Sequence, residues 1–516
     1  MSTRKSHPLL YPILTLSSAL LLLGMLSGCD NGHKVRLTDD TGNGGGQPSG
    51  QLGDIIRQQG LTGDPSIGRN LPDINDPIAQ LGMKLFYTKA LGGDKDTACV
   101  SCHHPVLGGG DDLSLPIGVG AFEQDMLGPG RIHSPFAPFY DGGPTVPRNA
   151  PTTFNAGLWD AVMFMDGRVE SLGKTPGKNG DDGAGITTPD VPYGTVDPDA
   201  GRNLAAAQSR FPITSPEEMR GHTFAAGLNN QTLRNYLQAR IGNYGTGAGE
   251  LPQNNWEAEF RSAFNLPDEP VTSLITSERI AQAIGEYERS QLFINTPWKA
   301  FVQGDSSAIS AAAKRGALLF FNPVSKGGAN CVACHSGDAF TDEQFHVIAS
   351  PQVGRGKGDG TDGTNDYGRF RVTGNPDDKF AFRTPSLLNI TATGPWSHAG
   401  AYTTLQAMIL HHLNPHVAIQ NYNFKQIDPS INADNMVPNT NEALEQLQRL
   451  RDAGRSKLVV TSLDDNQLAD LQAFLEALTD PCVESRECLS PWIPDASVKD
   501  PDGLRLDGYN AVGQKL

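Results

Sequence analysis

A mainly helical fold with long loops is what this sequence predicts, and three observations carry that expectation. Several segments place apolar residues at the spacing of one helix face. No segment sustains the apolar–polar alternation of a half-buried strand. Glycine occurs 58 times and proline 36 times in 516 residues, so many turns are expected between the helices.

The predicted helices are four amphipathic segments in which apolar side chains recur every three or four residues. They run over residues 76–87, 277–292, 308–321 and 462–478. The last is expected to begin with a capping box in which Ser462 caps and Asp465 takes the usual place of Glu. Two Gly-, Asp- and Pro-rich stretches, 174–202 and 354–378, are expected to be surface insertions.

The charge of the chain excludes one class of partner. The formal net charge is -16, from 41 basic and 57 acidic residues. Nucleic-acid binding depends on basic side chains that neutralise phosphates, so this composition argues against a nucleic-acid partner. An acidic surface could attract a basic partner protein, or it could serve solubility alone.

Residues 1–29 have the organisation of a bacterial lipoprotein signal. Two basic residues precede an apolar run that ends in Ser27-Gly28-Cys29, small residues before a cysteine. Cleavage there would leave Cys29 as an acylated N-terminus on the periplasmic side of a bacterial membrane. Residues 30–55 would then be a flexible tether. The alternative is an uncleaved transmembrane helix, which the shortness of the apolar run disfavours.

Two copies of the pattern Cys-x-x-Cys-His indicate covalently bound haem. Two thiols add across the two vinyl groups of a haem, and the adjacent histidine binds the iron from the proximal side. One copy could equally be a redox or zinc half-site, but two copies in an exported chain predict two c-type haems. The copies are Cys99-Val100-Ser101-Cys102-His103 and Cys331-Val332-Ala333-Cys334-His335.

Cys482 and Cys488 lie close together near the C-terminus and belong to neither motif. In an exported protein such a pair is expected to form a disulfide. Residues 481–516 are therefore expected to be a C-terminal tail that carries this bridge.

With both motifs in place, the chain resembles the bacterial di-haem cytochrome c peroxidases and their relatives, the methylamine-utilisation-type di-haem oxidases. The resemblance runs from about Asp76 to about Asp480. It implies two cytochrome c-like haem domains with long loops, here over residues 56–270 and 271–480. Its other landmarks are Leu81-Gly82-x-x-Leu85-Phe86, Arg148-Asn149-x-Pro151-Thr152, Asp166-Gly167-Arg168, Pro216-Glu217-Glu218-Met219 and Arg383-Thr384-Pro385-Ser386-Leu387.

In that family the first haem meets peroxide, and the resemblance implies an acid/base group beside it. The family's spacing of a Gln, a Pro and a Glu falls on Gln208, Pro212 and Glu218. Glu218 is implied as the group that moves a proton between the peroxide oxygens. Gln208 is implied to orient peroxide, and Pro212 to shape the pocket. From the residues alone, Glu218 could equally be a solvated carboxylate at a helix start.

The sequence departs from the peroxidases just after the first motif. Those proteins carry a histidine there that caps the resting iron, and the matching position is Val119, between Gly118 and Gly120. Valine cannot bind iron, so the first haem is expected to keep an open sixth position, as in the oxidase branch. His104 and His133 are the nearby alternatives; His104 directly follows the proximal ligand, and His133 lies in no motif.

The second haem is expected to have two histidine ligands. In the family the distal ligand, Met or Tyr, comes from the helix that follows a Gly-Pro-Trp-Ser-His run. That position falls on His412, which implies His335/His412 ligation and an iron that is easier to oxidise than one with a Met ligand. His411 and His416 remain alternatives. A further departure places Met165 where the family has a bridging Trp, which leaves the interhaem electron path open.

The resemblance also implies a calcium ion between the two haem domains. Its ligands would be the side chain of Asn149 and the backbone carbonyls of Thr393 and Pro395, and oxygen ligands suit this hard cation. Formation of local turns is the alternative role of these residues.

Three functions are compatible with these features. The first is a peroxidase that reduces hydrogen peroxide at the N-terminal haem, with electrons relayed through the C-terminal haem from a small periplasmic donor, a cytochrome c or a copper protein. The second is a peroxide-dependent oxidase that modifies a protein or metabolite, which Val119 and His412 keep open. The third is a non-catalytic electron-transfer cytochrome or redox sensor, against which Glu218 beside an open haem argues.

Overall fold

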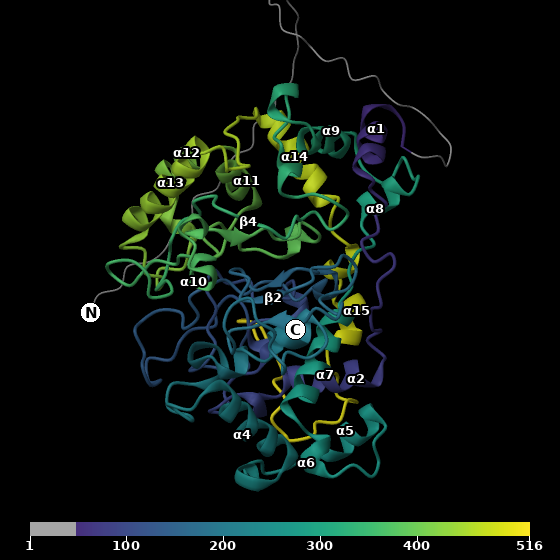
Figure 1. Cartoon of the computed structure of the whole chain (residues 1–516), viewed down its shortest axis with the longest axis vertical. Coiled ribbons are helices and arrows are strands. Elements are labelled where there is room, and N and C mark those ends of the chain that lie inside the picture. Colours follow the sequence, from purple (N-terminus) through teal and green to yellow (C-terminus); the bar gives the residue numbers. More distant parts are fainter. Residues whose placement is uncertain (1–47) are drawn as a thin grey trace, which may run out of the picture. The chain divides into compact units, whose positions relative to one another are not determined.

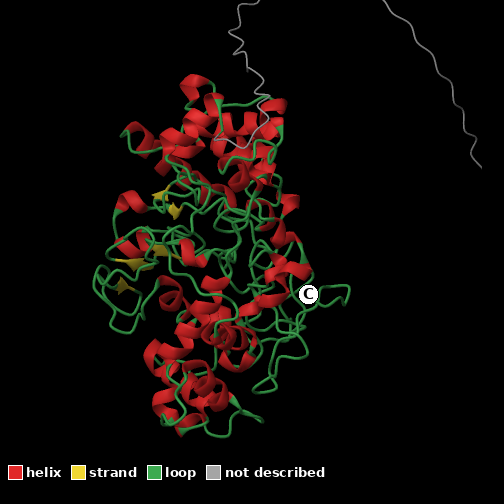
Figure 2. Ribbon diagram, turned by 90° about the vertical axis from the view of Figure 1, so that its right-hand side faces the viewer, coloured by secondary structure: helices red, strands yellow, loops and turns green. Residues whose placement is uncertain are grey.

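Helices joined by long loops make up residues 48–516, the part of the chain that this computed structural model describes (Figure 1). Figure 2 shows how much of the chain is loop and how short the strands are, so the expectation of a mainly helical fold is confirmed. The predicted signal with Cys29, and residues 30–47, lie outside the described residues. Within 48–516 no helix combines the length and the apolar character needed to cross a membrane.

A first hydrophobic cluster forms where α2 (Pro77–Tyr87) packs on α7 (Ser277–Ser290), in the lower half of Figure 1. Both helices lie where the apolar periodicity predicts them. A Cβ atom at Gly82 would lie 1.8 Å from the carbonyl oxygen of Ala283, so glycine is required for this close approach. The other helices of this cluster are α4 (Asn230–Gly242), α5 (Trp256–Phe264), α6 (Val271–Leu274) and α15 (Arg486–Leu489).

A second hydrophobic cluster forms around α9 (Ala311–Phe321) and α14 (Asp465–Glu476), in the upper half of Figure 1. Phe474 of α14 contacts both Trp298 and Phe320, with ring centroids 5.1 Å apart in each pair. Such aromatic pairs contribute beyond the area that they bury. The cluster also includes α1 (Gly50–Gln59), α8 (Pro297–Val302) and α11 (Leu405–Leu413).

Helix α1 shortens the predicted tether. Residues 30–55 were expected to be flexible, yet the helix begins at Gly50 and buries Leu52 and Ile56 in the second cluster. Two apolar residues four positions apart are one turn of a helix face. That signal is too short to stand out beside the preceding glycines, so the prediction for residues 50–55 is wrong.

The N-terminus of α14 also differs from its prediction. The cap is Asp464 rather than Ser462, and the helix begins at Asp465. The carboxylate of Asp464 accepts a hydrogen bond from the backbone N–H of Gln467 at 2.8 Å, and the side-chain oxygen of Gln467 accepts from the Asp464 N–H at 3.0 Å. This reciprocal pair is a complete capping box, which explains why the helix is capped by Asp464 rather than by the predicted Ser462.

The boundary between the two hydrophobic clusters falls later in the sequence than the predicted boundary between the two haem domains. Helix α7 and Phe293 belong to the first cluster, whereas Ile294 and Trp298 belong to the second. The domains 56–270 and 271–480 remain a prediction, and packing places the change between clusters some twenty residues beyond residue 270.

The C-terminal tail returns to the first cluster. Leu506 and Leu516 are buried there, and the Leu506 N–H donates a 2.8 Å hydrogen bond to the Tyr87 carbonyl at the end of α2. Cys482 and Cys488 form a disulfide with 5.2 Å between their Cα atoms. The tail is thus an integral part of the first cluster rather than an appendage.

The remaining elements belong to the long loops. Three antiparallel strands are β1 (Val162–Met163), β2 (Val169–Ser171) and β3 (Ile186–Thr187), and a second pair is β4 (Phe345–His346) and β5 (Phe382–Arg383). The remaining helices are α3 (Leu204–Ser209), α10 (Phe370–Thr373), α12 (Pro415–Gln420) and α13 (Met436–Asp452). Since β3 lies within 174–202 and pairs with β2, that stretch is not merely the surface insertion that was expected.

A buried ion network joins segments that are far apart in the sequence. The Arg148 guanidinium donates to Asp166 at 2.7 Å and to both oxygens of Asp366 at 2.6 and 2.8 Å. Nearby, Arg369 forms a buried ion pair with Glu170. Asp366 and Arg369 come from 354–378, so this stretch too is more than the predicted surface insertion. A buried ion pair forms favourably only when the geometry and the remaining hydrogen bonds offset desolvation, and here both carboxylates on Arg148 are well placed.

The Asp366→Asn variant should be destabilised by about 3 kcal/mol, the lower end expected for breaking a buried ion pair, because Arg148 keeps Asp166. Chemical denaturation followed by circular dichroism measures this change. Glu257→Gln is the control, since Glu257 forms an exposed ion pair with Arg261 one helical turn away, and its loss should be hardly detectable. Equal stability of the two variants would show that the Arg148 network does not hold the loops together.

Candidate functional site

A cavity of about 450 Å³ lies against the second Cys-x-x-Cys-His motif. Cys331 and Cys334 line it from η9 (Cys331–Ala333) and the residue after that turn, and His335 follows. Its walls are largely apolar, as expected for a site that excludes water from a cofactor. The apolar side chains on α9, α11 and α14 that line it are Phe320, Leu405, Met408, Ile409, Leu413, Leu471 and Leu475.

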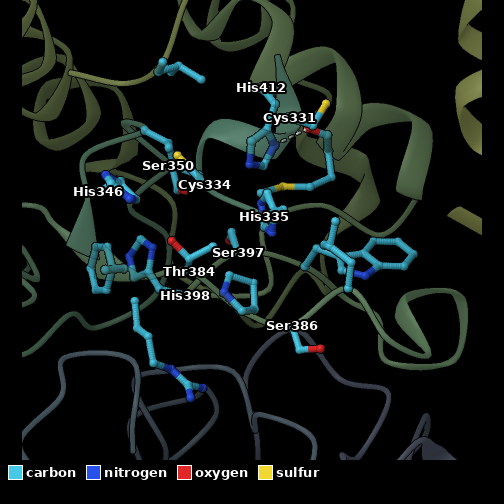
Figure 3. A pocket seen from close by; sticks show the side chains of 18 of the residues that line it. Cys331, Cys334, His335, His346, Ser350, Thr384, Ser386, Ser397, His398 and His412 are labelled. Atoms are coloured by element: carbon cyan, nitrogen blue, oxygen red, sulfur yellow. Dashed lines mark hydrogen bonds between the residues drawn. The ribbon is translucent and has the colours of Figure 1, made fainter. Parts of the chain in front are cut away.

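His335 and His412 face one another across this cavity. Figure 3 shows the two imidazoles one above the other, with Cys331 and Cys334 beside them. The ring centroids are 6.2 Å apart. Two bonds from imidazole nitrogens to a metal together span about 4 Å of such a separation. The distance from each nitrogen to the centroid of its own ring accounts for the rest. The spacing therefore suits one metal ion held between the two rings.

Hydrogen bonds fix the orientation of both rings. His335 Nδ1 is 3.1 Å from the carbonyl oxygen of Phe340, and His412 Nδ1 is 2.9 Å from that of Met408. A carbonyl oxygen only accepts, so both Nδ1 atoms carry the proton and both Nε2 atoms keep a free lone pair. Neutral imidazoles oriented in this way are typical metal ligands. Burial also lowers the pKa of His335 to about 4, which keeps the ring neutral.

The two alternative ligands are placed differently. Both ring nitrogens of His411 are already engaged, Nδ1 with the Tyr402 hydroxyl at 2.8 Å and Nε2 with the Ile348 carbonyl at 2.8 Å. His416 is exposed and does not line the cavity. Of the three histidines in this region, His412 alone offers a free nitrogen to the cavity.

Two buried polar groups on the cavity wall suit the anionic side chains of a haem. Arg383 Nε and His398 Nδ1 have no hydrogen-bond partner, although both residues line the cavity. Burial lowers the pKa of Arg383 to about 10, since Glu343 only partly offsets the loss of hydration. A cation in this position is stabilised by an anion such as a haem propionate. The residues around the second motif therefore fit a haem c.

The first motif lies at the edge of the first hydrophobic cluster. Cys99 begins η2 (Cys99–Ser101), and Cys102 and His103 follow directly. His103 Nδ1 is 3.1 Å from the Gly109 carbonyl, so its Nε2 is free in the same way as that of His335. The His103 ring contacts Phe86 of α2, with 6.5 Å between centroids. The covalent and axial donors of a c-type haem are thus present here as well.

Glu218 lies in a turn of π-helix, η6 (Pro216–Arg220), beside the first motif. The sulfur of Met219, the next residue, is 3.9 Å from the Cys99 sulfur, which anchors the turn on the motif. Glu218 itself is half-buried. π-Helical turns are rare and recur at functional sites. The structure therefore places this carboxylate next to the first haem motif.

Gln208 and Pro212 flank that turn. Gln208 lies near the end of α3, which packs on α7, and Pro212 begins a turn, η5 (Pro212–Thr214), that contacts η6. Both residues are half-buried. Pro212 therefore lies beside the Glu218 turn, whereas Gln208 lies earlier in the same segment of chain, on the helix that packs on α7.

Val119 lies directly against the Glu218 turn. Its N–H donates to the Glu217 carbonyl at 3.3 Å, and a Cβ atom at Gly118 would lie 2.5 Å from the Glu218 carbonyl oxygen. Arg131, a buried residue that the sequence did not single out, donates to the carbonyls of Ile117 and Gly118 and fixes the loop. A buried valine on a loop held by Arg131 thus lies at the position that the resemblance assigns to a capping histidine.

The other two histidines near the first motif have different surroundings. His104 is 1% exposed, accepts a hydrogen bond from the Val106 N–H at 3.2 Å, and packs against Tyr87. The charged groups that act on His133 are Asp141, Arg355 and His222. His133 Nδ1 is 3.1 Å from the Gly143 carbonyl. The absence of a sixth ligand at the first site stays a prediction.

Glu288 is a buried acid that sequence reasoning missed. It is 6% exposed, and burial raises its pKa to about 8. After burial itself, the charge of Glu288 is the largest influence that raises the pKa of the Cys99 thiol, so the two groups are close. On the predicted helix it is one of several polar positions, and the pattern alone gives no signal that it is buried.

The predicted calcium ligands all lie on the wall of the cavity. Asn149, Thr393 and Pro395 all line it. The Asn149 amide nitrogen donates to the Leu113 carbonyl at 2.9 Å, which leaves its side-chain oxygen available to a cation. A Cβ atom at Gly108, which follows the first motif, would lie 1.9 Å from the carbonyl oxygen of Ala392. The loop after the first motif therefore packs closely against the segment that contains Thr393.

Met165 and Trp159 also line the cavity. The Met165 carbonyl accepts a 2.8 Å hydrogen bond from the Arg383 N–H, and the Arg383 guanidinium lies 3.5 Å from the centroid of the Trp159 ring. A tryptophan is therefore present beside the second motif although it is out of register with the family's bridging residue. The sequence could place Trp159 only as a neighbour along the chain.

Comparison with known proteins finds relatives over the part of the chain that holds the first motif. Residues 76–307 match the family model described as di-haem cytochrome c peroxidase. The methylamine utilization protein MauG of Methylorubrum extorquens is 27% identical over 336 residues, which are 64% of this chain and 67% of that protein. The cytochrome c551 peroxidase of Pseudomonas aeruginosa is 25% identical over 330 residues, which are 63% of this chain and 69% of that protein.

Among solved structures, a MauG-like protein associated with microbial copper homeostasis is 20% identical to this chain, with a TM-score of 0.49. The match covers 82% of this chain and 96% of that structure.

His412→Met should raise the reduction potential of the second haem, because a thioether ligand favours the ferrous state. Spectroelectrochemical titration of the purified holoprotein measures the potential. His416→Met is the matched control, since His416 is exposed and lies on the neighbouring helix α12, and it should leave the potential unchanged. An unaltered potential and low-spin spectrum in His412→Met would show that another residue is the ligand.

Proposed function

We propose that the chain, whose residues 76–307 match the family model of the di-haem cytochrome c peroxidases, is a di-haem c-type peroxidase that reduces hydrogen peroxide. Peroxide reacts at the first motif, and electrons enter at the second motif from a small periplasmic donor, a cytochrome c or a copper protein. The observation that carries the proposal is the position of the turn that holds Glu218, whose Met219 sulfur lies 3.9 Å from the Cys99 sulfur, next to the loop that carries Val119.

The protein's part in this reaction is to hold two cofactors and to move protons. The haems supply iron that binds peroxide and exchanges electrons. Cys99, Cys102 and His103 would hold the first haem. Cys331, Cys334, His335 and His412 would hold the second, and Arg383 and His398 would stabilise its acidic groups.

Glu218 is proposed as the general acid and base. Cleavage of the O–O bond requires one proton to leave the inner oxygen of peroxide and to reach the departing oxygen. A half-buried carboxylate on a turn anchored by Met219 can take and return that proton. Gln208 orients the peroxide through its amide, and Pro212 limits the space beside it.

A peroxide-dependent oxidase is the second candidate function. Val119 gives the first site no internal cap, and His412 gives the second site a nitrogen ligand in place of sulfur, which favours a stored oxidising equivalent. Both features fit an enzyme that modifies a protein or metabolite. A non-catalytic electron-transfer cytochrome or redox sensor would have no use for Glu218 beside an open site.

We also propose a calcium ion at Asn149, Thr393 and Pro395. Support comes from the free side-chain oxygen of Asn149 and from the presence of all three residues on the wall of one cavity. An ion there would link the loop after the first motif to the segment before His412.

The proposed location is the periplasmic side of a bacterial membrane. The support is the sequence alone, through the lipoprotein pattern that ends at Cys29 and the two haem-attachment motifs. Acylation of Cys29 would anchor the protein to the membrane by lipid.

The resting holoprotein should show one high-spin and one low-spin ferric haem. Val119 leaves the first site without a sixth ligand, whereas His412 completes the second. Electron paramagnetic resonance of the untreated protein measures both states. Two low-spin signals would contradict an open first site.

Glu218→Gln should keep both haems and slow the reaction with peroxide by about 100- to 10,000-fold, the usual contribution of general acid–base catalysis. Gln has nearly the same size and still forms hydrogen bonds, but it cannot take and return a proton. Stopped-flow mixing with peroxide, followed at the Soret band, measures the rate.

The neighbouring carboxylate provides the matched control. Glu217 accepts a hydrogen bond from the Ser215 hydroxyl at 3.1 Å, and Glu217→Gln should react at the wild-type rate. If Glu218→Gln also reacts at the wild-type rate, the electron-transfer function becomes the better explanation of the chain.

A further inference from the structure

A group of exposed apolar side chains lies on the loop that follows Val119. This aromatic loop, residues 121–140, is closed by a β-bridge between Ala121 and His133, and the next pair inward places Phe122 opposite Ile132 on one face. Soluble proteins seldom leave several large apolar side chains exposed together, and such patches mark interaction surfaces. The exposed side chains, between 43% and 87% accessible, are Phe122, Ile132, Phe136, Phe139 and Tyr140.

Hydrogen bonds and a ring contact hold the aromatic loop in shape. The Ser134 N–H donates to the Gly120 carbonyl at 2.8 Å, and the Arg131 guanidinium donates to the carbonyls on the other side of the loop. The Tyr140 ring contacts the His133 ring, with 5.0 Å between their centroids. The apolar side chains are therefore exposed on a backbone that is held in place, not on a loose end of chain.

The backbone of Phe139 has an unfavourable conformation. Its φ is 62°, in the left-handed region that bulky residues rarely adopt. The His222 ring lies 4.9 Å from the Phe139 ring, yet Phe139 remains 66% exposed, so burial of the side chain does not compensate for the strain. Backbone strain of this kind is concentrated at functional positions. The outward direction of Phe139 therefore calls for a partner that covers it.

The aromatic loop has little charge with which to select a protein partner. No Asp, Glu, Lys or Arg lies between Ile132 and Tyr140, and burial lowers the pKa of His133, which keeps that ring neutral. Complementary charges around the contact usually select a protein partner, whereas uncharged aromatic and aliphatic side chains suit the interface of a lipid bilayer. The acidic residues that flank this stretch are engaged with other side chains: Asp125 with Lys89, Asp141 with Arg355, and Glu123 with Tyr509.

The lipid proposed on Cys29 would keep the folded chain close to a bilayer. Residues 30–49 separate Cys29 from α1. A fully extended chain spans at most about 3.6 Å per residue, so this connection reaches no farther than about 70 Å. A tethered surface meets its target at a high effective concentration. Even a weak affinity of the aromatic loop for lipid is then enough for frequent contact.

We propose that the aromatic loop docks on the lipid bilayer to which Cys29 tethers the chain, and that its exposed side chains insert among the lipid headgroups. The docking rests on the proposed location and does not depend on the peroxide reaction. It gives the protein a second attachment beside the lipid. Because Gly120 is hydrogen-bonded to Ser134, docking also turns the loop that carries Val119 toward the membrane.

Vesicle binding measures the docking without the lipid anchor. The holoprotein is exported behind a signal that is removed without acylation, so that the mature chain begins at Asp30 and lacks Cys29. Sucrose-loaded vesicles of phosphatidylcholine should carry this protein into the pellet on centrifugation. Binding should persist at high salt, because salt screens ionic contacts and not apolar ones.

Two variants and one control locate the contact. Phe136→Ser and Phe139→Ser should each weaken vesicle binding about tenfold, the lower end expected for losing one phenylalanine from an apolar contact. Phe424→Ser is the matched control, because Phe424 is 47% exposed in η12 (Phe424–Gln426), outside the loop, and it should bind as the wild type does. Each variant must first show the wild-type haem absorption spectrum. Wild-type binding by a chain with both loop substitutions would overturn the proposal.

Other occupants of the loop give different results. A wild-type dimer that the two loop substitutions convert to a monomer in sedimentation velocity, with no vesicle binding by either, would make the loop an interface between copies and overturn the proposal. Binding that requires phosphatidylglycerol and disappears at high salt would overturn it as well, because ionic attraction would then explain the contact.

Mass spectrometry of the N-terminal peptide of the natively exported protein tests the lipid separately. An acylated Cys29, together with an unlipidated chain that does not bind vesicles, would overturn the docking and leave the proposed location standing. Vesicle binding through the aromatic loop without acylation of Cys29 would support the docking and contradict the lipid anchor.

Discussion

The double ion pair of Arg148 is the interaction on which the placement of the cavity depends. It joins a loop that precedes Asn149 to the segment after Met165, and both of these neighbours line the cavity. Its third member, Asp366, comes from the long loop of the C-terminal half. Because the loops contain little regular structure, a small number of buried ion pairs hold these loops in place, as strands or helices would in a more regular fold. The cavity wall is therefore as rigid as this network.

This dependence makes the network sensitive to protonation. Burial alone would raise the pKa values of Asp166 and Asp366, but the charge of Arg148 lowers both below their usual range. A carboxylate with a depressed folded-state pKa contributes stability that is complete above its unfolded pKa. The contribution is lost as the pH falls through the folded value. At neutral pH the network is therefore fully formed, and only strong acid weakens it.

The sequence predicts those features that depend on short-range chemistry. The two haem motifs follow from covalent attachment, and α2, α7 and α9 follow from apolar periodicity. What it could not predict depends on contacts between distant segments. Arg131 is one of many arginines until the fold surrounds it with carbonyls, and Arg383 is a landmark whose place on the cavity wall depends on the fold. The cap of α14 was missed by two residues because adjacent polar residues offer competing caps.

The return of the C-terminal tail has a consequence for how the protein is assembled. Leu506 and Leu516 complete the cluster that contains α2, so the hydrophobic core beside the first motif needs residues from both ends of the described chain. Synthesis delivers that motif early and the tail last. The second cluster draws its other members, apart from Leu52, Ile56 and Leu61, from residues between Leu158 and Leu478, so it can close sooner. The core beside the first motif is therefore complete only once Leu506 and Leu516 have joined α2 and α7.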